Sequence, residues 1–321
     1  MKQRILTSVI TLSLLAAMPA WGQTTVIKRT PTTTQASKGK ARQQWKWHRD
    51  FDDKGLAPAM GYNENMGIID RSGKIVSPFI WRDVYGKHGG VFLVQDDNGK
   101  WGALDENGKL VVACQWKEFN SFSEGMALVK DDSGKYGFID QTGNLVSPCQ
   151  WKWASSFSEG LARVEDENSK LGFIDKSGNL VIPCQWENAD RFSEGLVAVK
   201  DAKKWGYIDK SGNIVIPCQW KGTYCFSEGL ARVKDDNDKW GFIDKNGKLV
   251  IPCQWESAGD FSEGLALVKN DNNKWGSIDK TGSVVIPCQF KYAFRFEKSK
   301  AKVTDASGKG YYIDKTGKKV E

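Results

Sequence analysis

Residues 226–255 read Phe226-Ser-Glu-Gly-Leu-Ala-Arg-Val-Lys-Asp-Asp-Asn-Asp-Lys-Trp240-Gly-Phe-Ile-Asp-Lys-Asn-Gly247-Lys-Leu-Val-Ile-Pro-Cys-Gln-Trp255. Three runs of apolar and β-branched residues, at 230–234, 240–244 and 248–251, alternate with two turn signals, which is typical of short strands. Gly247 supplies the positive φ of the second turn, and Pro252, which cannot donate to a ladder, is expected to end the third strand. The stretch therefore predicts a three-stranded meander, joined by Cys-Gln-Trp to the next Phe-Ser-Glu-Gly.

This unit recurs eight times along the chain. The Gly that follows Trp or its substitute falls at Gly67, Gly102, Gly137, Gly172, Gly206, Gly241 and Gly276, with an altered eighth copy at Gly310-Tyr311. An invariant Asp follows it, at Asp70, Asp105, Asp140, Asp175, Asp209, Asp244, Asp279 and Asp314. A fixed period of about 35 residues predicts an all-β tandem array, whose units stack because each is too small to bury its own core.

Three aromatic columns show where the stacking surface lies. The first is Trp101, Tyr136, Leu171, Trp205, Trp240 and Trp275; the second is Trp81, Trp116, Trp151, Trp186, Trp220, Trp255 and Phe290; the third is Phe51, Phe122, Phe157, Phe192, Phe226, Phe261 and Phe296. Leu, Tyr and Phe replace Trp in these columns, which keeps bulk and loses ring chemistry. Such tolerance favours packing over ligand binding.

The run Lys-Trp-Gly-Phe-Ile-Asp-Lys-x-Gly, followed by Val-Ile-Pro and then Phe-Ser-Glu-Gly-Leu-Ala, resembles the WG-repeat (KWG) family of bacterial proteins over residues 44–321. The resemblance implies a β-rich repeat module, often exported, with no settled biochemical activity. The first, second and eighth repeats depart from the pattern, for example at Met66 and at Lys87-His88-Gly89-Gly90.

Two architectures fit this array. Gln44-Trp45-Lys46-Trp47 reproduces Gln150-Trp151-Lys152-Trp153, so the two ends are complementary parts of one repeat, as a closed β-propeller requires. Against closure, the end repeats are degenerate and rich in Lys, which suits the caps of an open solenoid. Three strands are also one short of a usual propeller blade. We expect an open, twisted array, with the closed propeller as the alternative.

The N-terminal residues predict export. Lys2 and Arg4 precede the apolar run 5–17, and Ala20-Trp21-Gly22 offers a cleavage site, so residues 1–22 are expected to be a signal peptide. Residues 23–43 are predicted to be a disordered basic linker rich in Thr, Ser and Lys. The mature protein is expected in the periplasm, on the outer cell surface or secreted, with no integral membrane segment.

The net charge of +7 belongs to the ends of the chain. Of the 46 basic residues, two lie in the leader and seven in residues 23–49, which leaves 37 against 39 acidic residues. A nucleic-acid partner is therefore not expected, because its binding site would need basic residues clustered on the folded surface.

The repeated polar residues are interpreted as structural. An Asp at the first position of a turn accepts backbone N–H bonds from its own loop, so the Asp column needs no ligand. Acidic tips such as Asp235-Asp236-Asn237-Asp238 suggest Ca²⁺, but the fifth repeat has Asp201-Ala202-Lys203-Lys204 there. We therefore predict no metal site and no cofactor.

The cysteines are predicted to be buried free thiols. Cys114, Cys149, Cys184, Cys218, Cys253 and Cys288 occupy one position per repeat, and Cys225 is additional. Equivalent positions three strands apart are separated by roughly 14 Å, too far for a disulfide. A bridge between Cys218 and Cys225 stays open.

We expect a non-enzymatic module that binds a protein or cell-envelope partner through a repeated surface. The only histidines, His48 and His88, lie near one end, and an active site needs one unique cluster. The alternatives are a glycan- or peptidoglycan-binding module and a purely structural scaffold. The candidates for a ligand site are Trp116, Trp151, Trp186, Trp220 and Trp255, since Trp rings stack on sugars. Buried rings would favour packing.

Overall fold

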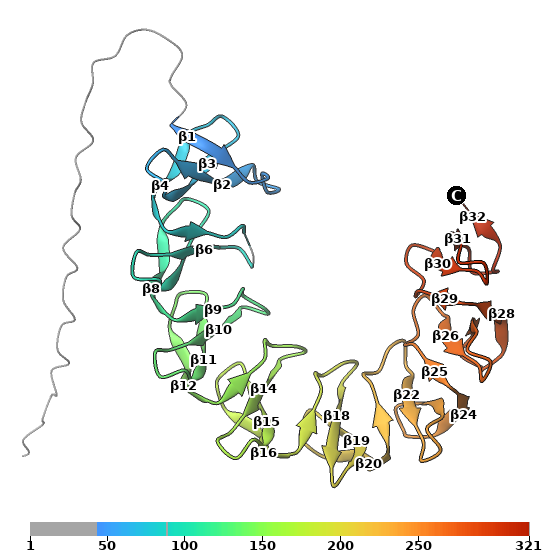
Figure 1. Cartoon of the computed structure of the whole chain (residues 1–321). Coiled ribbons are helices and arrows are strands. Elements are labelled where there is room, and N and C mark those ends of the chain that lie inside the picture. The colour runs from blue at the N-terminus through green and yellow to red at the C-terminus, as the bar shows by residue number, and fades with distance from the viewer. Residues whose placement is uncertain (1–43, 88, 321) are drawn as a thin grey trace, which may run out of the picture. The chain divides into compact units, whose positions relative to one another are not determined.

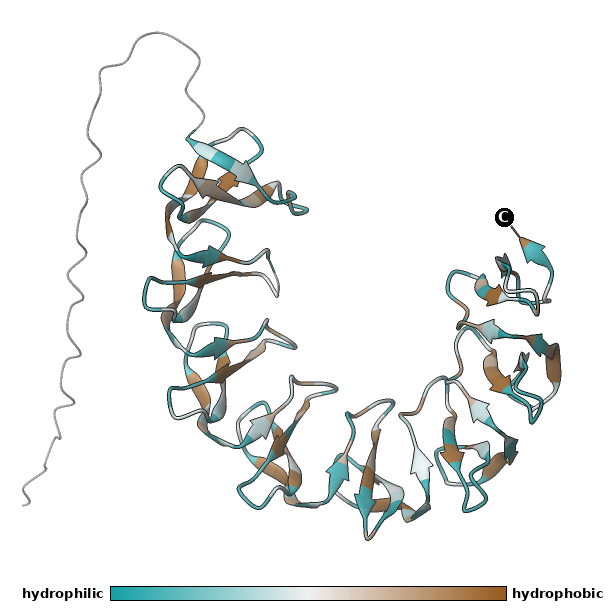
Figure 2. Ribbon diagram, in the orientation of Figure 1, coloured by the Kyte–Doolittle hydropathy of each residue, from teal (hydrophilic) through white to brown (hydrophobic). Residues whose placement is uncertain are grey.

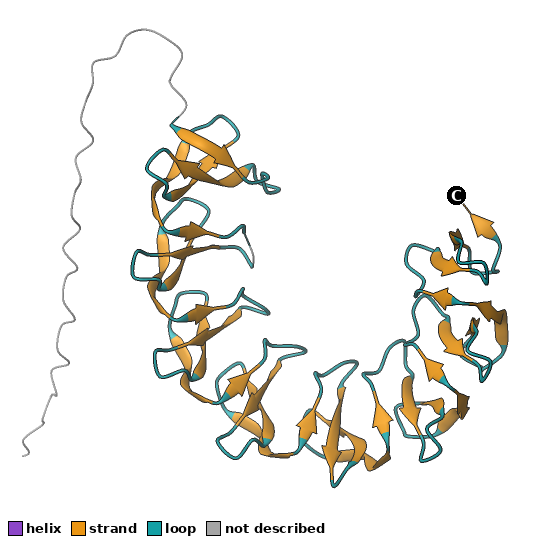
Figure 3. Cartoon of the chain, in the orientation of Figure 1, coloured by secondary structure: helices purple, strands orange, loops and turns teal. Residues whose placement is uncertain are grey.

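The computed structural model describes residues 44–87 and 89–320, and these residues form strands and loops (Figures 1 and 3). The predicted signal peptide and linker, residues 1–43, lie outside them, as do His88 and Glu321. No helix in the described part of the chain is long and apolar enough to cross a membrane.

The strands make eight four-stranded antiparallel sheets, numbered here as sheets 1 to 8 in chain order. Sheets 1 to 4 contain β1 (Trp45–His48), β2 (Leu56–Gly61), β3 (Met66–Asp70), β4 (Ile75–Trp81); β5 (Asp83–Val84), β6 (Phe92–Gln95), β7 (Trp101–Leu104), β8 (Leu110–Trp116); β9 (Glu118–Phe119), β10 (Met126–Lys130), β11 (Tyr136–Asp140), β12 (Leu145–Trp151); β13 (Trp153–Ala154), β14 (Leu161–Glu165), β15 (Leu171–Asp175), β16 (Leu180–Trp186). Sheets 5 to 8 contain β17 (Asn188–Ala189), β18 (Leu196–Asp201), β19 (Lys204–Asp209), β20 (Ile214–Trp220); β21 (Gly222–Thr223), β22 (Ala231–Lys234), β23 (Trp240–Ile243), β24 (Leu249–Trp255); β25 (Ser257–Ala258), β26 (Ala266–Lys269), β27 (Trp275–Ile278), β28 (Val284–Phe290); β29 (Tyr292–Ala293), β30 (Ala301–Thr304), β31 (Gly310–Ile313), β32 (Lys319–Val320).

The prediction of three strands per unit was wrong. A two-residue strand follows the Trp of the second aromatic column and pairs with the next strand, as Ser257–Ala258 pairs with Lys269 and Val268. Two residues are too few to show a period of two, so this strand has no signal in the sequence. The strand count consequently no longer argues against a propeller. Within the described residues no sheet combines strands of the first and last repeats, and an open array remains a prediction.

Pro252 does not end its strand, contrary to expectation. β24 runs from Leu249 to Trp255, and Pro252 is tolerated because β24 is the edge strand of sheet 6. The register shifts there: a step of two residues from Trp240 to Phe242 faces a step of four from Trp255 to Ile251. The extra residues of this β-bulge fold over Gly241.

The Gly of the Trp-Gly motif is required by this bulge. A Cβ on Gly241 would lie 2.5 Å from the carbonyl oxygen of Ile251 and 2.7 Å from the nitrogen of Cys253. Other Gly residues of this column, such as Gly102 and Gly172, lie equally close to the backbone of the facing strand. The motif thus pairs a large side chain with a neighbour that has none.

The apolar core lies between consecutive sheets and not within one. One cluster joins Phe242 and Ile251 of sheet 6 to Phe261 and Ile278 of sheet 7. The rings of Phe242 and Phe261 are 4.9 Å apart and T-shaped, and three earlier interfaces repeat a closely similar ring contact. The brown central strands of Figure 2 mark this core. Stacking of neighbours is therefore confirmed.

Phe-Ser-Glu-Gly is a turn that also binds the next repeat. In Ser158-Glu159-Gly160-Leu161 the two end residues exchange backbone hydrogen bonds, and φ is +52° at Glu159 and +87° at Gly160, as a two-residue type I′ hairpin needs. The Ser158 hydroxyl donates to the carbonyl oxygen of Phe192 at 3.2 Å. Glu159 accepts the N–H groups of Glu194 and Gly195, at 2.6 and 2.9 Å. Backbone strain at a non-glycine residue is thus offset by bonds across the interface.

The contacts of this turn recur between five successive pairs of repeats. The hydroxyls of Ser123, Ser158, Ser193, Ser227 and Ser262 each donate to a Phe carbonyl of the following repeat. The five Glu form ion pairs with Lys176, Lys210, Lys245, Lys280 and Lys315, at 3.0 to 3.2 Å. We call these hydrogen bonds and ion pairs the Ser-Glu ladder.

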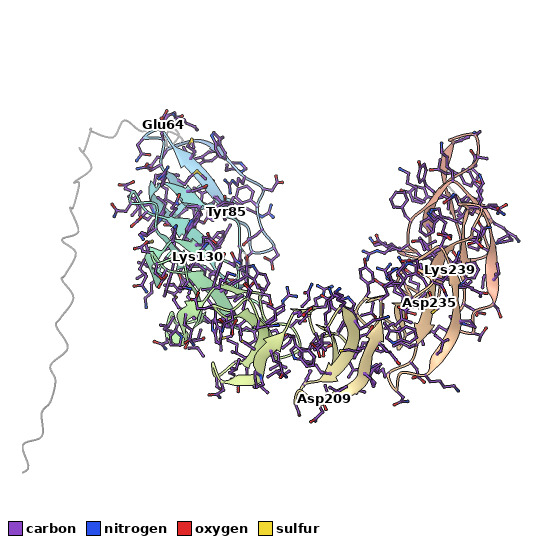
Figure 4. The ribbon with its side chains drawn as sticks, turned by 60° about the horizontal axis from the view of Figure 1, so that its bottom comes forward. Glu64, Tyr85, Lys130, Asp209, Asp235 and Lys239 are labelled. Atoms are coloured by element: carbon purple, nitrogen blue, oxygen red, sulfur yellow. The ribbon has the colours of Figure 1, made fainter. Side chains whose placement is uncertain are left out.

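Ion pairs also join the opposite loop tips. Lys100, Lys135, Lys204 and Lys239 pair with Asp132, Glu167, Asp236 and Asp271 of the following repeat. Figure 4 labels Lys239, which also contacts Glu256. These acids are mostly exposed, so the pairs contribute little stability.

We predict that Gly241→Ala lowers the free energy of unfolding by about 1–3 kcal/mol, because the added methyl group must push the bulge of β24 away. Gly222→Ala in the same sheet is the control, since the nearest atom to its Cβ would lie 3.5 Å away and its φ is not positive. Thermal melts compare the two variants, and equal melting temperatures would contradict the role of the bulge.

The Ser-Glu ladder predicts a pH dependence. Burial alone would raise the pKa of Glu159, but the N–H groups of Gly195 and Glu194 and the ammonium of Lys210 outweigh it, so its pKa lies below the ordinary 4.5. Glu124, Glu228 and Glu263 are shifted in the same direction. A lowered folded-state pKa gives stability that is complete above pH 4.5 and is lost as the pH falls through the folded-state value. Replacing all four by Gln should lower the melting temperature at neutral pH and flatten its fall in acid. An unchanged acid profile would contradict this.

Candidate functional site

The predicted Trp candidates lie in the packed framework. Trp116, Trp151 and Trp186 are buried, while Trp220 and Trp255 are half-buried. Each faces the first aromatic column across the sheet, as Trp255 faces Trp240. The two columns therefore form cross-strand aromatic pairs in most repeats, and little of either is left for a ligand.

The hydrogen bonding of the indole N–H groups of these Trp residues also indicates packing. Those of Trp116, Trp186, Trp220 and Trp255 are buried without a hydrogen-bond partner. Trp151 differs because its N–H donates to the hydroxyl of Ser147, which stands where most repeats have Ile or Val. Donors enclosed in this way cannot reach a ligand in solution.

The Asp column closes its own turns, as predicted. Oδ1 of Asp209, labelled in Figure 4, accepts the N–H groups of Ser211 and Asn213, both at 2.9 Å. The side-chain amide of Asn213 also donates to this carboxylate and is the main reason that the pKa of Asp209 lies below its ordinary value. Equivalent bonds occur at the other positions of the column.

The acidic tips use the same device. Asp235, also labelled in Figure 4, accepts the N–H of Lys239 at 2.9 Å. The fifth repeat is one residue shorter here, and Ala202 and Lys203 both take positive φ in a two-residue hairpin. That deletion explains why Gly206 follows Gly172 after 34 residues, whereas the other intervals between Gly67 and Gly276 are 35. Among residues 44–87 and 89–320, no three His, Cys, Asp or Glu side chains gather as metal ligands would.

All seven cysteines are free thiols, as predicted. Their side chains are half-buried, whereas burial was predicted. The Sγ of Cys253 lies against Gly241 and 3.9 Å from the carbonyl oxygen of Val233. Burial, with the charge of Asp235 nearby, raises the pKa of Cys253 to about 11. Cys225 also has a pKa of about 11, through burial and then the charge of Asp190, so neither thiol is an activated nucleophile.

The residues that differ most between repeats occupy four other columns. Aligned on the framework, these are Trp47, Asp83, Glu118, Trp153, Asn188, Gly222, Ser257 and Tyr292 in the first strand of each sheet; Tyr85, Asn120, Ser155, Asp190, Tyr224, Gly259 and Phe294 two residues later; Gly86, Ser121, Ser156, Arg191, Cys225, Asp260 and Arg295 next; and Leu93, Leu128, Arg163, Ala198, Arg232, Leu267 and Lys302 in the second strand. We call these residues the variable face.

Three cavities show that these columns form a surface. One of about 570 Å³ between sheets 2 and 3 is lined by Tyr85, Leu93 and Glu118 among others. One of about 240 Å³ lies at Trp153, Arg163 and Asn188. One of about 420 Å³ includes Arg191, Arg232 and Arg295. Each cavity is lined by side chains from at least two neighbouring repeats.

Exposed aromatic side chains gather on the variable face. Among the described residues, seven aromatic side chains are large exposed hydrophobics, and five of them belong to its first two columns: Trp47, Tyr85, Tyr224, Tyr292 and Phe294. Phe294 is 60% exposed. Guanidinium groups stack among these rings, with Arg163 4.8 Å from the Trp153 ring and Arg232 3.4 Å from the Tyr224 ring. Comparison of aligned repeats in the sequence could have found this surface, because variation against a constant framework is visible there.

Comparison with known proteins gives a family and little else. A family model described as "WG containing repeat" matches seven segments: residues 66–101, 101–135, 136–170, 172–205, 205–240, 240–275 and 275–305. The structure has eight four-stranded sheets, one more than the seven matched segments. No curated protein matches the chain.

Several solved structures share part of the arrangement at low identity. A eukaryotic initiation factor is 11% identical, with 88% of each chain covered and a TM-score of 0.47. BamB from Moraxella catarrhalis is 11% identical, with 88% of this chain and 99% of that chain covered and a TM-score of 0.36. The WD40 β-propeller domain of Doa1 is 10% identical, with 72% and 92% covered and a TM-score of 0.29. These TM-scores are too low to carry an argument about this chain.

The raised thiol pKa values predict slow alkylation. In the native protein at pH about 8, the cysteines should react with iodoacetamide much more slowly than after denaturation, because the thiolate is the reacting form and the thiols are partly covered. Mass spectrometry after timed quenching counts the modified sites. Rapid labelling of one thiol per repeat in the native protein would contradict the packing described here.

Proposed function

Because the chain belongs to the WG-repeat family, and because its framework residues are committed to stacking, we propose that it is an exported, non-enzymatic module that binds a protein or cell-envelope partner. The variable face supplies the binding surface. Cleavage before Gln23 would release the mature chain to the periplasm, the outer cell surface or the medium; the basic start and short apolar run support this part of the proposal.

The single observation that carries the proposal is the position of the exposed aromatic residues. Five of the seven lie in two columns of the variable face, although these columns hold a minority of the described residues. Aromatic and Arg side chains are the residues that dominate the energetics of protein interfaces, because they combine large area with directional contacts. Their gathering on the variable face fits the binding of a protein.

The repeated polar groups support a non-enzymatic role. Each Asp of the column binds its own turn, each Ser-Glu pair between repeats three and eight binds the next repeat, and the repeat thiols are packed against Gly. These side chains have structural partners that account for their recurrence. A framework fixed in this way suits a binding module whose specificity lies in the columns that vary.

Glycan binding and pure scaffolding are the competing functions, and the edge strands offer a competing surface. In most sheets the first residue of the last strand is an exposed aliphatic residue, for example Leu180, which is 46% exposed, and Ile214, which is 61% exposed. These aliphatic residues occupy a position that is nearly constant between repeats, unlike the positions of the variable face. A partner that binds them would therefore be insensitive to changes in the variable columns.

The test is capture of partners from the envelope fraction by three forms of the mature protein. The first is the wild type, whose intact mass also shows whether the chain starts near Gln23. The second combines Tyr85→Ser, Tyr292→Ser and Phe294→Ser. The third, the control, combines Leu180→Ser and Ile214→Ser. We predict that a protein captured by the wild type and by the control is lost with the second form, while all three have similar melting temperatures.

Other outcomes contradict the proposal. Loss of the partner with the control form would assign binding to the edge strands. Elution of the captured material by soluble glycan would assign the face to sugars. Equal capture by all three forms would leave no role for the variable face.

A further inference from the structure

The cavity at sheets 5 to 8 is the most cationic part of the variable face. Arg191, Arg232 and Arg295 line it, together with Asp260 and the hydroxyls of Ser193, Ser227 and Ser262. Three guanidinium groups therefore face one carboxylate in the lining. The rest of the folded array carries slightly more acidic than basic residues, so this concentration of positive charge is local.

The three guanidinium groups are held differently. Nε of Arg232 contacts Asp260 at 2.8 Å, its Nη1 donates to the carbonyl oxygen of Ala258, and the group stacks on Tyr224. Arg295 pairs with Glu297 at 2.7 Å and is largely exposed. Arg191 is exposed and makes no ion pair with a described residue. Since a guanidinium has five N–H donors, each group retains donors for a ligand.

Nearby acids cancel only part of this charge: Asp260 pairs with Arg232 and Glu297 with Arg295, whereas Arg191 makes no ion pair with a described residue. Asp190 lies beside the cavity, where the Cys225 thiol donates to it at 3.3 Å and its charge also acts on Arg163. Asp190 is thus shared with Arg163, which lies outside the lining. An anionic ligand would find Arg191 unpaired and Arg232 already oriented by three neighbours.

The two other cavities differ in character. The lining between sheets 2 and 3 combines Tyr85, Leu93, Phe119 and Phe122 with few charges. The small cavity at sheet 4 places Arg163 over Trp153. Along the chain, the three cavities therefore change from apolar and aromatic to cationic.

We propose that the Arg191–Arg232–Arg295 cavity binds carboxylate side chains of an extended acidic peptide segment of the partner. Arginine forks match carboxylates in geometry and charge. Arg191 and Arg295 occupy equivalent columns of different repeats, so they suit charges spaced along a chain. The proposal rests on the proposed function, because the peptide is taken to belong to a protein held by the variable face.

The test uses a short fluorescein-labelled peptide of alternating Glu and Ser residues, and the matched peptide of Gln and Ser, in fluorescence anisotropy with the mature protein. We predict binding of the Glu peptide that is weakened about tenfold by Arg191→Gln combined with Arg295→Gln, the cost of losing charge-assisted hydrogen bonds. Lys248→Gln combined with Lys109→Gln is the control, since it removes the same charge at exposed positions outside the cavity and should leave the affinity nearly unchanged. Arg232 is left intact because it also joins two repeats.

The outcomes separate the two proposals. No binding of the Glu peptide, equal binding of the Gln peptide, equal loss in the control, or competition by an oligothymidylate at equal charge would each overturn the carboxylate site. Capture that still depends on Tyr85, Tyr292 and Phe294 would then leave the proposed function standing. Loss of that dependence with the peptide still bound would overturn the proposed function and not the cavity.

Discussion

The contact between consecutive sheets is the interaction on which this structure depends. A four-stranded sheet of about 35 residues cannot enclose a core, so Phe242 of one sheet needs Phe261 of the next, and Ile251 needs the turn at Gly282. The Ser-Glu ladder adds directional bonds to the same interface, from Ser227 to Phe261 and from Glu228 to Gly264. Stability is thereby distributed over nearest neighbours, as in other repeat arrays.

The structural roles of the repeated residues explain why most of them recur in every unit. Gly241 repeats because a bulge lies over it, Asp244 because it binds two N–H groups of its turn, and Glu228 because it binds the next repeat. Most residues of the variable face have no such duty and differ between repeats, although Leu93, Leu128 and Ala198 of its fourth column also pack in the core. A surface that varies on a constant scaffold is where one array can acquire a partner of its own.

The sequence predicted the parts of this fold that a periodic pattern can express. The repeat length, the second and third strands, the Asp turns and the Phe column at Phe261 follow from spacing and turn chemistry. The strand at Ser257–Ala258 did not, since two residues have no period, and the passage of a strand through Pro252 depends on its place at a sheet edge. The role of Glu228 was missed because its partner lies 36 residues away, beyond any local signal. The ligand candidates Trp116 to Trp255 occupy the most repeated positions, whereas the binding surface that we propose occupies the least repeated ones.

Amide hydrogen exchange tests the dependence on neighbour contacts most directly. Glu159 in sheet 4 accepts the N–H groups of Glu194 and Gly195 in sheet 5, so Glu159→Gln weakens bonds that belong to the next repeat. We predict faster exchange at 194–195 and around the turn of sheet 5, with the exchange of sheet 8 unchanged. Faster exchange confined to sheet 4, or uniform faster exchange along the whole array, would contradict it.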